Sequence, residues 1–343
     1  MDMFDLAIAT VSSPMILCFV VGLGLALARL PIAVPALLSK ALGLYLLFAI
    51  GLKGGAGVAE HGADGTLASG LIAGALLSLL MPLVAFWLLQ RLTNVGRIDA
   101  AAISAHYGSI SIVTFTAAIA LLGTVGVAYE GWMVAVAAVM EAPAILTALV
   151  LARGSVLVSR QGSVAGGGTL TAGAPFFDAS QLGGPIREAV LNKAFVVLIG
   201  AFALGWAVGP GGLDAAALVV VWPFQLALCA FLLDMGLTAG RGLRQSAGAL
   251  TPPLLGFGLV MPLIGAVLGL AAGHLVGLSE GGLALLAVLA ASASYIAAPA
   301  AMRSALPEAR PELYLTLSLG VTFPFNLIIG LALYLTLAGW VAG

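Results

Sequence analysis

The sequence predicts an all-α polytopic membrane protein of ten transmembrane helices, built as a five-plus-five inverted repeat with interrupted helices 4 and 9. Three observations lead to this prediction. The 343 residues are 62% hydrophobic and only 8% charged, whereas a soluble domain carries roughly a quarter charged residues. Apolar runs of about 20 residues recur, each long enough to cross a hydrocarbon core of about 30 Å. Finally, Lys and Arg gather in alternate loops.

The apolar runs define the spans in order. They are expected at about 11–29, 34–52, 66–90, 99–123, 128–152, 189–209, 215–237, 247–273, 281–302 and 313–340. Every Lys and Arg except Lys53 falls in five alternate loops: Arg29, Lys40; Arg91, Arg97; Arg153, Arg160, Arg187, Lys193; Arg241, Arg244; Arg303, Arg310. Because cytoplasmic loops retain positive charge, both termini are expected outside the cytoplasm, in a bacterial inner (plasma) membrane. The acidic start "MDMFDLAIATVSSP" lacks the basic region of a cleaved signal peptide.

The chain divides into two similar halves. Residues 1–152 and 189–343 are expected to form five-helix repeats, joined by a Gly- and Ser-rich flexible cytoplasmic linker at 153–188. "GLKGGAG" (51–57) matches "GLTAGRG" (236–242) at an offset of 236 − 51 = 185. An odd number of spans per half makes the second copy enter from the opposite side. Inverted repeats of this kind are typical of secondary transporters, with sites near the midplane on interrupted helices.

Two small, polar stretches are candidates for that site. "HYGSISIVTFT" (106–116) lies in the fourth span and "SASYIAAP" (292–299) in the ninth, roughly 15–21 Å along each helix. Non-helical backbone at this depth is tolerated only where it lines a cavity or the protein interior. Freed N–H groups there suit an anion, and hydroxyls and carbonyls suit a small cation. The alternative is that the small residues only allow close helix packing.

Glu141 is the single carboxylate deep inside a span, about 20 Å from its Tyr129 end. Such a group is costly and usually functional. It could ligate Na⁺, carry a coupling proton, or stay protonated against a hydroxyl. By the offset between Pro143 and Pro324 (324 − 143 = 181) its counterpart is Thr322, so an ion site would be asymmetric.

Three other polar residues have less specific interpretations. Asp234 is expected to pair with Arg241 or Arg244 near the cytoplasmic end of span seven. Lys53, at the outer end of span two, either snorkels to the surface or attracts an anion. His106 is expected to be a hydrogen-bonded packing residue rather than a proton carrier.

Several classes of function are excluded by composition. The net charge of −1 gives no reason to expect a nucleic-acid partner. The three histidines are dispersed, so no metal-ligand spacing exists, and no catalytic motif marks an enzyme. We therefore expect no cofactor, with Na⁺ only as a coupling ion. The two cysteines are expected to be small buried hydrophobes within their spans.

Four segments carry a resemblance to a known family: "YGSISIVTFTAAIALL", "YEGWMVAVAAVMEAPAILTALVLA", "AASASYIAAPAAMRSALP" and the "GLKGG" run. They resemble the sodium-dependent bicarbonate transporter family of the cyanobacterial carbon-concentrating mechanism, across nearly the whole chain except 153–188. The resemblance implies Na⁺-coupled symport by an elevator-like motion of core against gate helices, in a homotrimer surrounded by membrane lipid. Its cyanobacterial members are regulated by a PII-like trimeric protein at the cytoplasmic face. The loop here is shorter and different, which leaves that partner open.

The resemblance also implies the site residues. The substrate positions are Gly108, Ser109, Ser111, Ser292, Ser294, Tyr295, Ile296 and Ala298, and the ion positions are Thr114, Glu141 and Ser294. This sequence departs from the family pattern at several of them. Tyr295 replaces an Asp, Glu141 an Asp and Lys53 a Thr. Ile112-Val113 stand for Gly-Ser, and Ala297-Ala298 for Ser-Gly.

These departures remove a carboxylate and add apolar bulk, so four hypotheses stay open. They are a Na⁺-coupled carrier of bicarbonate or another small anion, a proton-coupled carrier of a small organic anion, a passive anion channel, and a scaffold without transport.

Overall fold

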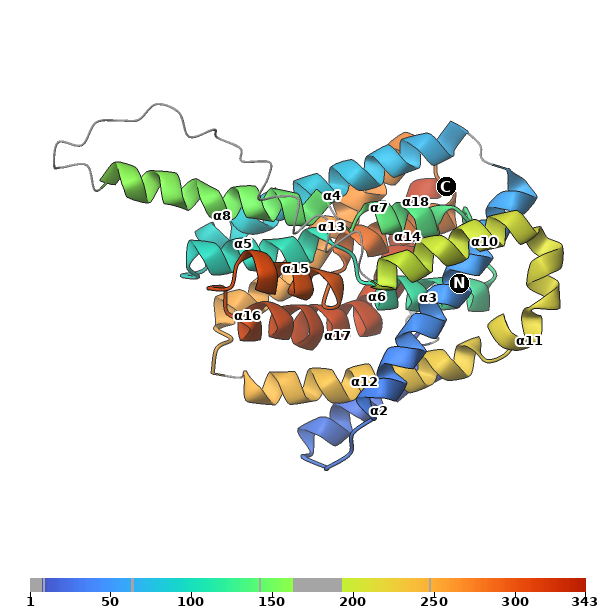
Figure 1. Cartoon of the computed structure of the whole chain (residues 1–343), viewed down its shortest axis with the longest axis horizontal. Helices are drawn as coiled ribbons and strands as arrows, with labels where there is room; N and C mark the ends of the chain where they lie inside the picture. The colour runs from blue at the N-terminus through green and yellow to red at the C-terminus, as the bar shows by residue number, and fades with distance from the viewer. Residues whose placement is uncertain (1–7, 9, 63–64, 142, 163–192, 247) are drawn as a thin grey trace.

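The fold is entirely helical over the residues described in the computed structural model (8, 10–62, 65–141, 143–162, 193–246 and 248–343; Figure 1). The first half holds α2 (Pro14–Leu27), α3 (Ala36–His61), α4 (Gly65–Leu92), α5 (Arg97–Gly108), α6 (Ile112–Val125), α7 (Met133–Val139) and α8 (Pro143–Gly162). The second half holds α10 (Lys193–Ala215), α11 (Ala217–Val220), α12 (Phe224–Gln245), α13 (Pro252–Val276), α14 (Glu280–Ala291) and α15 (Ala297–Ala305). It ends with α16 (Pro311–Leu315), η2 (Thr316–Thr322), α17 (Phe323–Phe325), η3 (Asn326–Gly330) and α18 (Leu331–Ala342).

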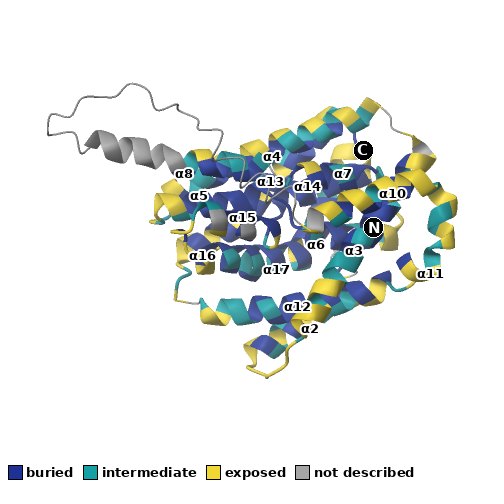
Figure 2. Ribbon diagram, in the orientation of Figure 1, coloured by how far each residue is buried: buried dark blue, intermediate teal, exposed yellow. Residues whose placement is uncertain are grey.

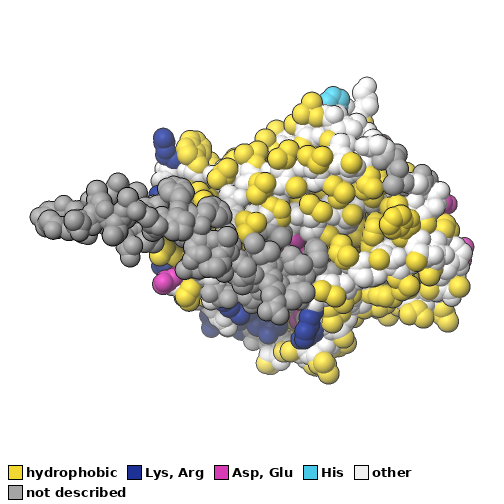
Figure 3. Space-filling model, turned by 45° about the horizontal axis from the view of Figure 1, so that its top comes forward, with side chains coloured by type: hydrophobic (Ala, Val, Ile, Leu, Met, Phe, Trp, Pro, Cys, Tyr) yellow, Lys and Arg dark blue, Asp and Glu magenta, His cyan; other side chains and the backbone are white. Residues whose placement is uncertain are grey.

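Eight helical segments are long and apolar enough to cross a membrane. They coincide with eight of the ten spans expected from the sequence. The other two expected spans contain the shorter apolar helices α2 and α14. The protein is therefore a multi-pass membrane protein. Figure 3 shows one face covered largely by hydrophobic side chains, as a lipid-facing surface requires.

Two helix pairs join the halves at one side of the molecule. α2 packs along α12, and α3 packs along α10 (Figure 1). Glycines make both contacts close. A Cβ on Gly236 of α12 would collide with the backbone oxygen of Phe19 in α2, and one on Gly205 of α10 would collide with that of Leu52 in α3. Close approach of backbones through small residues is the usual way that helices associate in lipid.

The remaining helices form a second body around two central broken helices. α4 and α13 contact each other, and α5 and α14 lie inside them and are buried along most of their length (Figure 2). All side chains from Ala100 to Gly108 and from Gly281 to Ala291 are buried. These two helices therefore face protein on all sides, and their inner ends can leave helical geometry without exposing backbone to lipid.

The interruptions predicted in spans four and nine are present. α5 stops at Gly108, and Ser109 is extended at φ −90°, ψ 154°. α6 restarts behind Ser111, whose Oγ accepts a hydrogen bond from the Thr114 N–H and so caps the new helix. α14 stops at Ala291, and Ser292 is extended at φ −82°, ψ 162°. Serine favours such ends because its hydroxyl satisfies backbone groups outside the helix.

The sequence did not predict two further irregularities. The fifth span is divided into α7 and α8 just before Pro143, which lacks the N–H needed to continue a helix. In the tenth span, α17 lies between the wide turns η2 and η3, and Pro324 sits in α17. Breaks and π-type turns inside a helix commonly mark functional sites.

Two helix ends differ from expectation. α3 continues to His61 instead of ending at 52, so Lys53 lies within the helix and not at its end. α8 continues to Gly162, which makes residues 153–162 helical; the rest of the expected linker, 163–188, lies outside the described residues. Both extensions follow sequences without proline, so no residue blocks helix propagation there.

Candidate functional site

The two interrupted helices bond directly to each other where they cross. The Ser111 N–H donates to Ser292 Oγ at 2.8 Å, and the Ser294 N–H donates to the His106 carbonyl at 2.7 Å. Ser111 and Ser292 are 181 residues apart, the same offset that separates Pro143 from Pro324. Two positions that the sequence offset pairs therefore meet at this crossing.

The crossing leaves hydroxyl hydrogens available. Ser111 Oγ accepts from the Thr114 N–H at 3.3 Å and from Thr114 Oγ1 at 2.9 Å, so its own hydrogen must point elsewhere. Ser294 Oγ likewise accepts from the Ala298 N–H at 3.3 Å. The buried hydroxyl of Tyr295 has no hydrogen-bond partner among the described residues. Buried polar groups without partners are rare, so these donors suggest a bound ligand.

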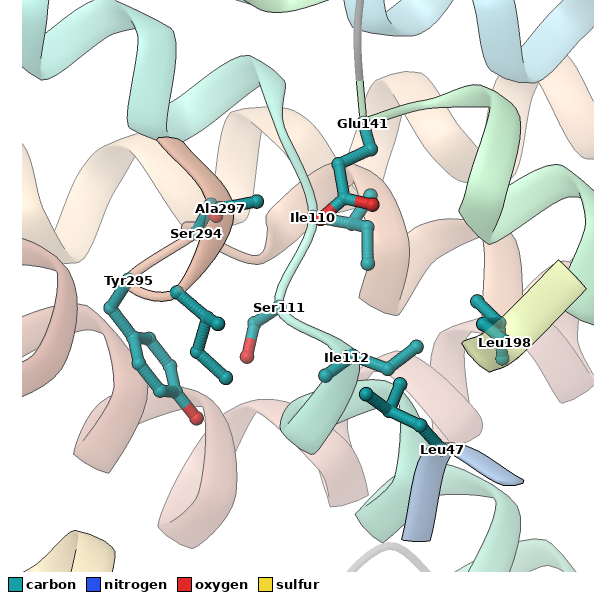
Figure 4. Close-up of a pocket in the computed structure, with 10 residues that line it drawn as sticks. Leu47, Ile110, Ser111, Ile112, Glu141, Leu198, Ser294, Tyr295 and Ala297 are labelled. Atoms are coloured by element: carbon teal, nitrogen blue, oxygen red, sulfur yellow. The ribbon is translucent and has the colours of Figure 1, made fainter. Parts of the chain in front are cut away.

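A small cavity lies at the crossing (Figure 4). Its volume of about 20 Å³ compares with the 10–15 Å³ that one water molecule requires. The lining residues are Leu47, Ile110, Ser111, Ile112, Glu141, Leu198, Ser294, Tyr295, Ile296 and Ala297. In Figure 4 the Ser111 and Tyr295 hydroxyls point to the same side, away from Glu141. The cavity thus has a carboxylate end and a hydroxyl end.

The Glu141 carboxylate enters this cavity from the break between α7 and α8. Ser78 of α4 bonds to both sides of this break. Its Oγ donates to the Met140 carbonyl at 2.6 Å and accepts from the Ala144 N–H at 3.1 Å. No described side chain forms an ion pair with Glu141, since Arg310–Asp99 at 2.8 Å is the ion pair found among these residues. A carboxylate in this setting calls for a cation or a proton.

Thr322, which the 181-residue offset pairs with Glu141, has all its hydrogen-bonding capacity used by neighbouring groups. Thr322 Oγ1 donates to the Gly258 carbonyl at 2.7 Å, so the Tyr107 hydroxyl must donate to Thr322 at 2.6 Å. The two halves are therefore unequal at this point, with an open carboxylate in one and a closed hydrogen-bond chain in the other.

The predicted site residues divide into three groups. Those that line the cavity are Ser111, Glu141, Ser294, Tyr295 and Ile296. Those bonded to a lining residue are Ser292, Thr114 and Ala298.

Gly108 and Ser109 lie outside the cavity lining. A Cβ on Gly108 would collide with the Pro82 ring, so this glycine allows α5 to pack against α4. Ser109 is fully buried and its Oγ has no partner among the described residues.

Five lining residues were not among the predicted substrate and ion positions. Ile110, Ile112 and Ala297 adjoin predicted positions and could have been inferred from them. Leu47 and Leu198 come from α3 and α10, and no sequence signal distinguishes them from other apolar residues of those helices. Only the fold brings them to the crossing.

Two larger cavities adjoin the crossing, and we call them together the inner vestibule. Their volumes are about 330 Å³ and about 410 Å³, and both include Thr238, Tyr295 and Leu319 in their walls. Their charged lining residues are Lys40, Lys193 and Arg241, all from the loops expected to be cytoplasmic. The crossing therefore adjoins a basic vestibule on that side.

The less specific expectations have mixed outcomes. Asp234 is buried but pairs with neither expected arginine, because Arg241 Nε donates to the Leu237 carbonyl and Arg244 Nη1 to the Ala26 carbonyl. Both arginines that lie near Asp234 in the sequence donate to backbone carbonyls instead. Lys53 Nζ lies 4.3 Å from the centre of the Phe224 ring, a cation–π contact.

His106 is a packing residue, as expected. Its ring stacks on Tyr314 with centroids 4.4 Å apart, and Nδ1 bonds to the Ala102 carbonyl at 2.7 Å.

Comparison with known families decides the identity. The family model described as the Na⁺-dependent bicarbonate transporter superfamily matches residues 14–339, nearly the whole chain. The protein belongs to the Na⁺-dependent bicarbonate transporter superfamily. A search of curated proteins gave no match. Membership makes the protein a membrane transporter of a superfamily described by Na⁺-dependent bicarbonate transport.

The oxygen atoms at the crossing are suitable ligands for a small hard cation. No group of three or more His, Cys, Asp and Glu side chains occurs in the described part of the chain. Glu141 together with hydroxyl and carbonyl oxygens offers the oxygen ligands that alkali and alkaline-earth cations take, without the nitrogen or sulfur that zinc prefers.

Proposed function

We propose that the protein is a Na⁺-coupled symporter of bicarbonate or a similar small anion. The observation that carries this proposal is the crossing cavity, where one carboxylate without an ion-pair partner adjoins hydroxyl donors and two helix N-termini. The first turns of α6 and α15 leave backbone N–H groups without intrahelical partners and present a positive dipole end. Such ends bind anions without a charged side chain.

Coupling follows from the charge of Glu141. An anion entering the cavity meets a carboxylate, and two like charges about 6 Å apart at an effective dielectric constant of about 20 repel by roughly 3 kcal/mol. A cation on Glu141 removes that repulsion, which corresponds to about a hundredfold in anion affinity. Na⁺ and anion therefore bind together, with Na⁺ at Glu141 and Ser294 and the anion at the hydroxyl end.

We further propose an elevator-like motion of the two bodies of the fold. The α2–α12 and α3–α10 pairs form the gate, and the helices around the crossing form the moving core. The proposal of a ten-span inverted repeat is supported by pairings that correspond between halves, since α2 with α12 and α10 with α3 exchange under a two-fold axis. Pro82 of α4 and Pro262 of α13 also correspond, at 262 − 82 = 180.

The resemblance to the cyanobacterial members supports two partner proposals. One is a homotrimer, and the other is a PII-like regulator at the cytoplasmic face. Most of the loop that such a regulator would contact, 163–192, lies outside the described residues. Ser109, Ala298 and Gly108 are proposed to support the site through backbone geometry rather than through contact with the anion.

A proton-coupled carrier of a small organic anion is the second candidate, and it uses the same cavity. The observation that favours it is Tyr295, which stands where the family has a carboxylate and so leaves one acidic ligand fewer for Na⁺. A passive channel is less well supported, because the crossing cavity of about 20 Å³ is too narrow for a continuous pore in this conformation.

Uptake of ¹⁴C-bicarbonate into proteoliposomes tests the proposal. We expect saturable uptake that is driven by an inward Na⁺ gradient in the wild type and loses its Na⁺ dependence in Glu141→Gln. Uptake driven by a proton gradient alone would select the second candidate. Uptake indifferent to Na⁺ and to the substitution would refute the symport proposal.

A further inference from the structure

The inner vestibule is much larger than bicarbonate requires. The part next to α3 measures about 330 Å³ and the part next to α12 about 410 Å³, against about 20 Å³ at the crossing. The 330 Å³ part shares Leu47, Ile112, Tyr295 and Ile296 with the crossing cavity. Ligand pockets for organic molecules begin at about 300 Å³, so the space adjoining the anion site has the size of an organic ligand pocket.

The vestibule walls are mainly apolar. Besides the four shared residues, the side chains that line the 330 Å³ part include Leu44, Leu46, Val113, Phe231, Met235 and Leu319. These side chains come from gate helices α3 and α12 and from core segments α6 and η2. Bicarbonate has no apolar group and gains nothing from such walls, whereas each buried methylene of a ligand adds to affinity. The lining therefore matches a ligand with an apolar body.

The charges of the vestibule select an anion. Lys40, Lys193 and Arg241 are its charged lining residues, and none of its described lining side chains is acidic. Tyr295 is one of its lining residues, and the hydroxyl of this side chain is buried and has no hydrogen bond of standard geometry among the described residues. Figure 4 shows this hydroxyl and that of Ser111 turned to the same side. A carboxylate placed beside these two hydroxyls would accept a hydrogen bond from each.

From these features we infer that the transported anion is a monocarboxylate with a short apolar chain. Its carboxylate takes the place of bicarbonate at the crossing, held by Ser111 and Tyr295, and its chain lies between Ile112, Ile296 and the vestibule wall. The inference rests on the proposed function, because it uses the same anion site and the same coupling cation at Glu141. Under this inference, the apolar residues by which this chain departs from the family pattern serve substrate recognition.

Isothermal titration of the purified protein in detergent tests the inference with linear carboxylates from formate to hexanoate, in NaCl and in choline chloride. We expect affinity to rise about fourfold for each added methylene in NaCl. Bicarbonate and formate, which have no methylene, are expected to bind weakest. Titration into micelles alone gives the reference for partition into detergent.

Two substitutions report on where the chain lies. Gly43 of α3 lines the vestibule, and a Cβ there would lie 3.3 Å from Phe231, so Gly43→Val narrows the space. We expect it to lower the ratio of hexanoate to formate affinity about tenfold, the equivalent of nearly two methylenes. Gly24→Val on α2 is the matched control, because an added Cβ meets no atom within 4 Å there, and its ratio should equal that of the wild type. Leu319→Phe fills the vestibule from the core side and serves as a second narrowing variant.

The outcomes separate the inference from the proposed function. Na⁺-dependent binding of bicarbonate with no gain along the carboxylate series would overturn the inference and leave the proposed function standing. A gain that persists equally in both narrowing variants would reflect partition rather than the vestibule and would also overturn it. Absence of binding for every anion in NaCl would overturn both.

Discussion

Replacing Ser292 by alanine tests whether the crossing depends on the bond between the halves. Ser292 Oγ accepts from the Ser111 N–H at 2.8 Å and donates to the Leu289 carbonyl at 2.9 Å. Ser111 is 3% exposed and Ser292 is 1% exposed, so water cannot readily replace the lost acceptor. A buried donor left without a partner costs about 1–3 kcal/mol. We therefore expect Ser292→Ala to lower the free energy of unfolding by about 2 kcal/mol and to weaken anion binding about tenfold.

The matched control is Ser318→Ala. Ser318 is also fully buried, but its Oγ donates only to the Tyr314 carbonyl four residues earlier. Losing that bond leaves no backbone N–H unpaired, so the expected cost is below about 1 kcal/mol. Denaturant unfolding of both variants in detergent, together with anion titration, gives the comparison. Equal losses of stability with unchanged anion affinity would refute the view that the Ser111–Ser292 bond organises the site.

Three further predictions use the same measurements. Tyr295→Phe removes a hydroxyl without a partner, so stability should hold or rise while anion affinity falls about tenfold; a matching loss of stability would contradict this. Gly236→Ala, whose Cβ would strike the Phe19 carbonyl in α2, should destabilise by about 3 kcal/mol, whereas Gly242→Ala, with open space around it, should cost nothing. Asp99→Asn should cost only about 1 kcal/mol, and less in high salt, because Arg310 is half exposed.

The broken helices were predictable because their signals are local. Serines and small residues in the middle of an apolar run are poor choices for a lipid-facing helix, and extended backbone begins at Ser109 and Ser292 as that pattern indicates. The 181-residue offset also pairs Ser111 with Ser292, which the structure bonds together. Glu141 was found because an ionisable group deep in a span is conspicuous.

The remaining features depend on tertiary contacts that no local pattern reveals. Gly108 was predicted to lie in the substrate site. The structure gives a packing reason for this glycine, because a Cβ there would collide with the Pro82 ring. Leu47 and Leu198 line the cavity only because α3 packs along α10. Lys53 was placed at a helix end, but helix α3 has no stop signal before His61. The 330 Å³ part of the vestibule is lined from six separate segments and has no sequence signature of its own.

The central claim is that a cation on Glu141 permits an anion to bind at the hydroxyl end of the same cavity. It is tested most directly by the bicarbonate dissociation constant measured by titration calorimetry with and without 100 mM Na⁺, in the wild type and in Glu141→Gln. We expect Na⁺ to lower the wild-type constant about a hundredfold, and we expect the variant to bind bicarbonate equally with and without Na⁺. A wild-type constant that does not change with Na⁺ would contradict it.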